Sequence, residues 1–223
     1  MGDRYGLDKI GSMQYKGILQ GKDVPVGGGS YVVENNVAGE ACNFWPIHTK
    51  WDDGREQDIC YGFTETKTSK SGKIQDLHIE KIEGCEHCTK EEFVEDVTVI
   101  YCAARPHQGF TSVVGWYKHA IVYRKYQIAE VPLSDGTYDY QYYNAKALKE
   151  DCVLLPKNER RITKWNVPRR QTGASYGFGQ SNVWFADGRR ENKLLDEFLK
   201  KTIDKIENYQ GENWIDIQQD TLM

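Results

Sequence analysis

The chain lacks any run approaching eighteen consecutive apolar residues, so the sequence predicts no membrane-spanning helix and no membrane partner. The opening residues MGDRYGLDKI lack the apolar core of a secretory signal, and we therefore expect a cytoplasmic, intracellular protein. Position 6 holds neither Ser nor Thr, which argues against N-myristoylation of Gly2. Without a secretory signal, the six cysteines are expected to be reduced thiols rather than a disulfide framework.

An excess of positive charge is also missing. The chain has 29 Lys and Arg against 33 Asp and Glu, a formal net charge of −4, which argues against tight non-specific binding to nucleic acid. One segment is nevertheless strongly basic, namely PKNERRITKWNVPRR at residues 156–170. It is either an ordinary solvated loop or a local phosphate-binding face.

The common catalytic motifs are absent. The sequence contains no HExxH, no Gly-x-Ser-x-Gly and no Walker loop, and the glycines at 27–29 are not followed by Lys and Ser or Thr. The sequence therefore predicts no catalytic residue, no cofactor and no metal site. A binding protein is favoured over an enzyme. The strongest enzymatic alternative is a Mg²⁺-dependent nuclease, with Asp58, Glu65 and Lys67 orienting water for phosphodiester cleavage.

A zinc site is a second alternative that the sequence leaves open. Cys85 and Cys88 form a CxxC pair with His78 and His87 nearby, but the second pair that a zinc ribbon needs is missing.

The remaining sequence is that of a folded domain. It has 223 residues, 39% hydrophobic and 28% charged, without repeats or long linkers. Apolar and β-branched patterns predict strands, and a period near 3.6 predicts one amphipathic helix at Glu191–Tyr209, ended by Gly211. The predicted strands are Gln14–Leu19, Ala41–Pro46, Ile59–Thr64, Ile74–Ile82, Val97–Ala103, Thr111–Tyr117, Ala120–Tyr126, Tyr138–Asn144 and Cys152–Leu155. This pattern indicates an α+β fold around a closed or nearly closed β-barrel.

Tryptophan is the residue that most suggests a binding site. The chain has six, including Trp45, Trp51, Trp116, Trp165 and Trp184. Most tryptophans are buried in cores, but two or three around one concave site form a cage for a planar or methylated base. Asn43 beside Trp45 adds a donor and an acceptor that could bind the edge of a base, and Ser30 after the glycines could add another.

A set of segments in this order resembles the N-terminal reader module of modification-dependent (type IV) HNH restriction endonucleases, which carries an EVE-like domain. That module is similar to the PUA superfamily, with its YTH, EVE and ASCH domains. The resemblance covers residues 14–187. The segments are GGGSYVV at 27–33, CNFWP at 42–46, VTVIYCA at 97–103, VVGWYKHAIVYR at 113–124, CVLLPKNERR at 152–161 and GFGQSNVWFA at 177–186.

The resemblance implies a PUA-like (EVE/YTH-type) β-barrel with flanking helices, spanning residues 1–187, and a C-terminal helical extension at 188–223 packed on it. It implies a pocket for a modified base flipped out of nucleic acid, which carries over to Ser30, Tyr31, Asn43, Trp45 and Trp116. Phosphate contacts are assigned to Lys118, Arg124, Arg160, Arg161, Lys164, Arg169 and Arg170.

The expected function is therefore that of a reader of a 5-substituted cytosine in DNA, such as 5-methylcytosine, in a modification-dependent restriction system. No HNH segment follows the reader pattern, so we expect one of three arrangements: a nuclease acts in trans, the reader functions alone, or a nuclease segment lies outside this sequence. A YTH-like RNA-binding protein that recognises a methylated base is the first alternative.

Overall fold

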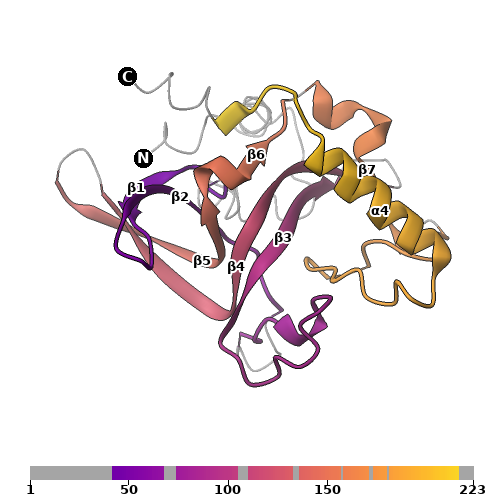
Figure 1. Ribbon diagram of the computed structural model, residues 1–223, viewed down its shortest axis with the longest axis horizontal. Helices are drawn as coiled ribbons and strands as arrows, with labels where there is room; N and C mark the ends of the chain where they lie inside the picture. Colours follow the sequence, from indigo (N-terminus) through magenta and orange to yellow (C-terminus); the bar gives the residue numbers. More distant parts are fainter. Residues whose placement is uncertain are drawn as a thin grey trace, which may run out of the picture.

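A computed structural model describes residues 42–67, 74–104, 110–132, 136–156, 158–170, 173–179 and 181–215. Within these ranges the chain forms an antiparallel sheet with one long helix beside it (Figure 1). The α+β class expected from the sequence is therefore present. No helix among the described residues has both the length and the apolar character needed to cross a membrane.

The sheet has seven strands in the described part of the chain. Its main path runs β1-β2-β5-β4-β3, and β6 and β7 both pair with β4. All these pairs are antiparallel. The strands are β1 (Ile47–Lys50), β2 (Glu56–Gly62), β3 (Phe93–Ala104), β4 (Phe110–Pro132), β5 (Tyr138–Leu148), β6 (Cys152–Leu154) and β7 (Asn166–Pro168).

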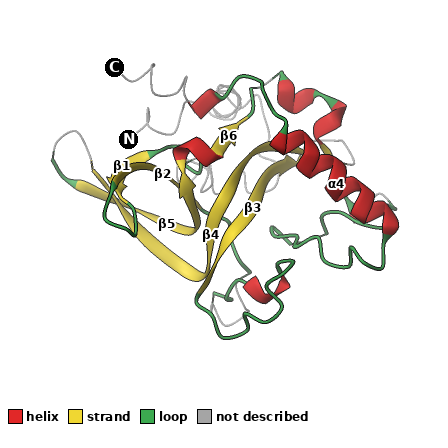
Figure 2. Cartoon of the chain, viewed as in Figure 1, coloured by secondary structure: helices red, strands yellow, loops and turns green. Residues whose placement is uncertain are grey.

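The 23-residue strand β4 organises the whole sheet (Figure 2). One of its edges pairs with β3, and the other pairs in turn with β7, β6 and β5. Strands β1 and β3 stand at the two ends of the path and do not pair with each other. The described strands therefore form an open path, whereas the sequence predicted a closed or nearly closed barrel.

The break predicted between the strands Thr111–Tyr117 and Ala120–Tyr126 is wrong, because β4 continues through residues 118–119 as a bulge. Val97 pairs with Ala120 and Val99 with Tyr117, so β4 carries an extra residue there. His119 takes a φ of 48°, and its Nδ1 lies 2.6 Å from Oδ1 of Asp96. In the sequence, Lys118 and His119 at the bulge interrupt a run of apolar residues, and a hairpin turn interrupts such a run in the same way.

The segment Ile74–Ile82 is likewise not the predicted half-buried strand. It contains one isolated bridge residue and then the 3-10 helix η1 (Ile79–Lys81). Its alternating apolar residues arise because Leu77 and Ile79 pack into a cluster with Val94 and Val122. The predicted strand at Ala41–Pro46 is a turn over residues 42–44 that leads into β1.

The C-terminal helix is confirmed as α4 (Lys193–Glu207). The side chain of Asn192 accepts a hydrogen bond from the backbone N–H of Leu195, a normal N-cap. The helix ends at Asn208 rather than at the predicted Gly211. Its buried side packs on Trp116 and Trp165 of the sheet region through Ile206, with Phe198 at the margin. Three further 3-10 helices are η2 (Lys149–Asp151), η3 (Glu159–Arg161) and η4 (Thr163–Trp165).

Candidate functional site

A pocket of about 190 Å³ opens beside the bend of β4. It is smaller than the ~300 Å³ at which sites for drug-sized ligands begin, so it suits one small ring system. Its walls combine an aromatic ring, an amide, a hydroxyl, a carboxylate and two cationic side chains. These residues are Tyr126, Asn144, Thr66, Asp76, Arg124 and Lys125.

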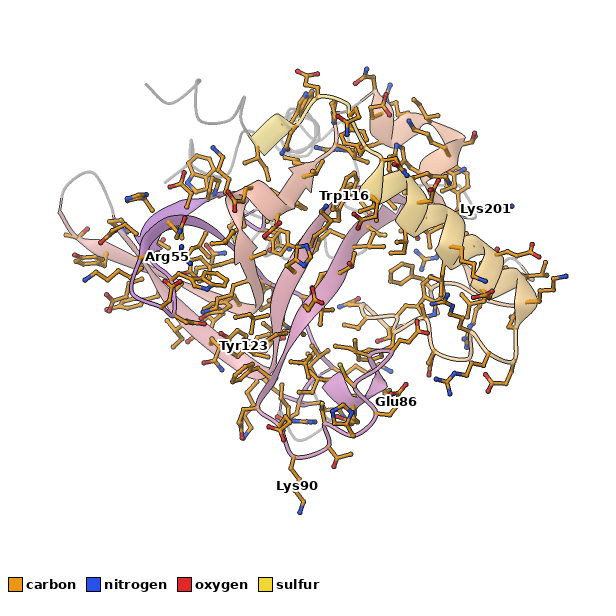
Figure 3. The ribbon with its side chains drawn as sticks, viewed as in Figure 1. Arg55, Glu86, Lys90, Trp116, Tyr123 and Lys201 are labelled. Atoms are coloured by element: carbon orange, nitrogen blue, oxygen red, sulfur yellow. The ribbon has the colours of Figure 1, made fainter. Side chains whose placement is uncertain are left out.

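A second bulge in β4 creates this pocket. Val122 pairs with Ala145 and Gln127 pairs with Tyr143, so the four β4 residues 123–126 face only one residue of β5. The extra residues interrupt the pairing with β5, although Tyr123 still pairs with Phe93 of β3, and such a bulge is a common way to place side chains at a site. Figure 3 labels Tyr123 at this bend, far along β4 from Trp116.

The aromatic wall is held rigidly. The hydroxyl of Tyr126 accepts a hydrogen bond from the backbone N–H of Thr66 at 2.7 Å, and its ring stacks on Phe63 with centroids 5.3 Å apart. The amide of Asn144 donates to the carbonyl of Thr64 at 2.8 Å and accepts from the Thr64 N–H at 3.1 Å. These contacts leave one further donor and one further acceptor position on the Asn144 amide.

Arg124 has a different role from the phosphate contact expected of it. Its guanidinium donates to the carbonyls of Glu91 and Cys88, both at 2.8 Å, and to the carboxylate of Glu80 at 2.7 Å. The side chain is only 14% exposed. Arg124 therefore fastens the segment that carries η1 and the CxxC pair against β4, and its charge is neutralised by Glu80.

A row of exposed tyrosines extends from the pocket along β5. Tyr138, Tyr140 and Tyr142 are 59%, 62% and 57% exposed, and Ile128, paired with Tyr142 on β4, is 56% exposed. Gln141 and Tyr143, at alternate positions on the other face of the strand, are buried. Asn144 follows Tyr142 by two residues and lines the pocket.

The base pocket expected from the sequence does not assemble as predicted. Asn43 is buried, and its amide is bonded to both backbone groups of Phe63, at 2.9 Å and 2.8 Å. Trp116 is 0% exposed and stacks on Trp165, so neither face of its indole is open to a ligand. Ser30 and Tyr31 lie outside the described residues.

Trp45 and Trp51 are half-buried and pack against one shared cluster of buried side chains that includes Tyr61 and Tyr143. The ammonium of Lys146 lies 4.8 Å from the ring centroid of Trp51 and 2.6 Å from the Asp52 carboxylate. The protein's own lysine therefore contacts the Trp51 ring. Burial raises the pKa of the neighbouring Tyr123 and Tyr143 hydroxyls to about 12, so both stay protonated.

The seven predicted phosphate-binding residues do not form one surface. Arg160 is buried, donates to the carbonyl of Leu155 at 2.6 Å and lies over the ring of Trp214. Lys118 faces Glu207 at 3.4 Å, and Lys164 faces Glu159 at 3.1 Å. Arg161 and Arg170 are exposed, and Arg169 is half-buried. Their segment lies near β7 and α4, on the opposite side of the view from the CxxC loop that holds Glu86 and Lys90 (Figure 3).

The groups proposed for the nuclease alternative have separate partners. Asp58 is hydrogen-bonded to His48 at 2.8 Å, and Glu65 lies 3.4 Å from the amide of Asn182. Cys85 and Cys88 are both free thiols, and burial together with Cys88 raises the pKa of Cys85. The described residues contain no group of three or more His, Cys, Asp or Glu side chains that could hold a metal ion.

Sequence reasoning missed Tyr126, Asn144 and Asp76, because a bulge brings them together and no motif marks it. The tyrosine row did leave a signal, since YDYQY at 138–142 repeats Tyr at every second position of a predicted strand. No protein-family model, curated protein or solved structure matches this chain.

Proposed function

We propose that the chain binds nucleic acid and holds a single base in the Tyr126 pocket. The observation that carries the proposal is the chemistry of that pocket: one small cavity joins an aromatic ring, a partly free amide, an exposed carboxylate and a lysine. Planar heterocycles with polar edges are recognised by this combination of stacking and edge hydrogen bonds.

Each group has a distinct part in the proposed complex. A base that lies against Tyr126 extends the ring stack that begins at Phe63. The Asp76 carboxylate accepts from an amino or imino group, and the Asn144 amide supplies the further donor and acceptor that Thr64 leaves available. Lys125 is exposed at the pocket, and in the proposed complex it contacts a phosphate.

The resemblance to modified-base readers makes a 5-substituted cytosine in DNA the first ligand to test. The proposal keeps the PUA-like, EVE/YTH-type identity as its framework but moves the reading pocket from the Asn43–Trp45 region to the bulge of β4. Asn43 and Trp116 then stabilise the domain, because both are buried.

The experiment is a binding panel with plain, methyl-, hydroxymethyl- and glucosylated-cytosine DNA, N6-methyladenine DNA, and matched RNA. We expect one modified base to bind preferentially, and Asp76→Asn to reduce that preference about ten-fold, since one good base-edge contact gives ~1–3 kcal/mol of discrimination. Asp187→Asn, another exposed aspartate outside the pocket lining, is the matched control. A preference that Asp76→Asn leaves unchanged overturns the pocket assignment, and RNA-only binding favours the YTH-like alternative.

A further inference from the structure

The outer face of the β4–β5 hairpin carries three exposed tyrosines. Tyr138, Tyr140 and Tyr142 occupy alternate positions of β5, and each is more than half exposed. Their cross-strand neighbours Pro132, Glu130 and Ile128 share the face. Single exposed apolar residues are ordinary on a surface, but three aligned tyrosines beside Ile128 form a continuous patch, which indicates an interaction site.

The spacing of the tyrosines selects the form of nucleic acid that fits. Alternate residues of a strand are roughly 7 Å apart. Stacked bases in a duplex rise only about 3.4 Å per step. Bases that stack on successive tyrosines must therefore be separated from one another, as in an extended single strand. A duplex presents its base faces to one another and offers none to such a row.

The cross-strand neighbours of the three tyrosines include no cation, so a nucleic acid would contact this part of the face through its bases. Glu130 is exposed opposite Tyr140. A surface that gripped the phosphate backbone would need cations at these positions. The nearest cation by position on β4 is Lys125, at the pocket end of the row. The row thus offers stacking, and the pocket end offers a phosphate contact.

From this geometry we infer that the tyrosine row binds a single-stranded stretch of about three nucleotides next to the base held in the pocket. The inference rests on the proposed function and names its substrate class: a base in single-stranded rather than fully paired nucleic acid. The tyrosine row leads to the pocket along β5, because Tyr138, Tyr140, Tyr142 and Asn144 occupy every second position of this strand.

The test uses the full chain and a fluorescein-labelled oligo(dT) of about 12 nucleotides, free or annealed to oligo(dA), with binding measured by anisotropy. We expect oligo(dT) to bind more tightly than the duplex. Each of Tyr138→Ala, Tyr140→Ala and Tyr142→Ala should weaken single-strand binding by about five-fold or more. Tyr140→Phe should bind like the wild type, because the ring is retained. Leu194→Ala, which removes a 60% exposed side chain from α4, is the matched control.

The outcomes separate the two proposals. If the alanine variants bind oligo(dT) as the wild type does, the row inference is overturned, and the proposed function stands provided that Asp76→Asn still reduces base preference. If the wild type binds no oligonucleotide in either assay, the proposed function fails together with the inference. If the triple alanine variant instead converts a dimer to a monomer in sedimentation and leaves oligonucleotide binding unchanged, the row binds a second copy of the chain and the inference is overturned.

Discussion

The contact between Glu80 and Arg124 should contribute measurably to folding stability and should do so in a pH-dependent way. Arg124 is the residue through which the segment around η1 is attached to the bulge of β4, and its guanidinium donates to the Glu80 carboxylate at 2.7 Å. The pKa of Glu80 falls from 4.5 to about 2, because its own backbone N–H and the Arg124 side chain both stabilise the carboxylate. Glu80→Gln keeps the size of the side chain and removes the charge.

The size of the effect follows from that pKa. A fall in the pKa from 4.5 to about 2 corresponds to a ceiling of about 3 kcal/mol. The Glu80 side chain is 24% exposed, so solvent screens part of this, and Arg124 is only the second-largest cause of the shift. We therefore expect Glu80→Gln to cost about 1–2 kcal/mol at neutral pH, with a coupling to Arg124→Met of about 1 kcal/mol in a double-mutant cycle.

Urea unfolding of wild type, the two single variants and the double variant measures these quantities. Because folding lowers the pKa of Glu80, its contribution is fully present above about pH 4.5 and is lost as the pH falls towards 2. The difference between wild type and Glu80→Gln should shrink over that window, while the exposed control Glu95→Gln should show little difference at any pH. A coupling near zero, or a difference that does not change with pH, would refute the reasoning.

Two further predictions test the core and the first bulge of β4. Trp116→Ala should destabilise the fold by about 3–5 kcal/mol in urea unfolding, because the indole is fully buried against Trp165 and Tyr209. A loss of stability below about 1 kcal/mol would contradict a position in the core. The hydrogen bond to Asp96 raises the pKa of His119, so that contact stabilises the fold below the usual His pKa and fades as pH rises above it. His119→Asn, which tolerates the positive φ, should therefore be less stable than wild type in acid and equal to it in alkali, and the reverse order would count against the ion pair.

The sequence predicted the regular parts of the fold well, because their signals are local. The apolar stripe of α4 and the β-rich runs in β3, β4 and β5 report their own secondary structure through periodicity alone. The errors fall where residues distant in sequence decide the outcome. Leu77 and Ile79 are apolar at alternate positions because both pack against residues of β3 and β4. The local sequence does not distinguish this packing from a half-buried strand.

The candidate site was harder to predict because it depends on side-chain direction. Asn43 and Trp116 have the right chemistry for a base pocket, but the first is bonded to Phe63 and the second lies in the core beneath α4. Tyr126 and Asn144 carry no motif, and a bulge of β4 brings them to one cavity. Composition shows which residue types are available for binding, whereas the register of the strands determines which of them lie close together.

The distribution of positive charge decides how strongly salt should affect binding. Seven independent phosphate contacts would give a slope of log K against log salt near −6 for duplex DNA. Arg124 and Arg160 are turned inward, and Lys118 and Lys164 face carboxylates. Of the two cationic side chains that line the pocket, Lys125 is the exposed one. Binding through the pocket and the tyrosine row should therefore show a shallow slope of about −1, which Lys125→Gln removes. A steep slope that Arg161→Ala and Arg170→Ala reduce instead would place the interface beside α4 and away from the β4–β5 hairpin.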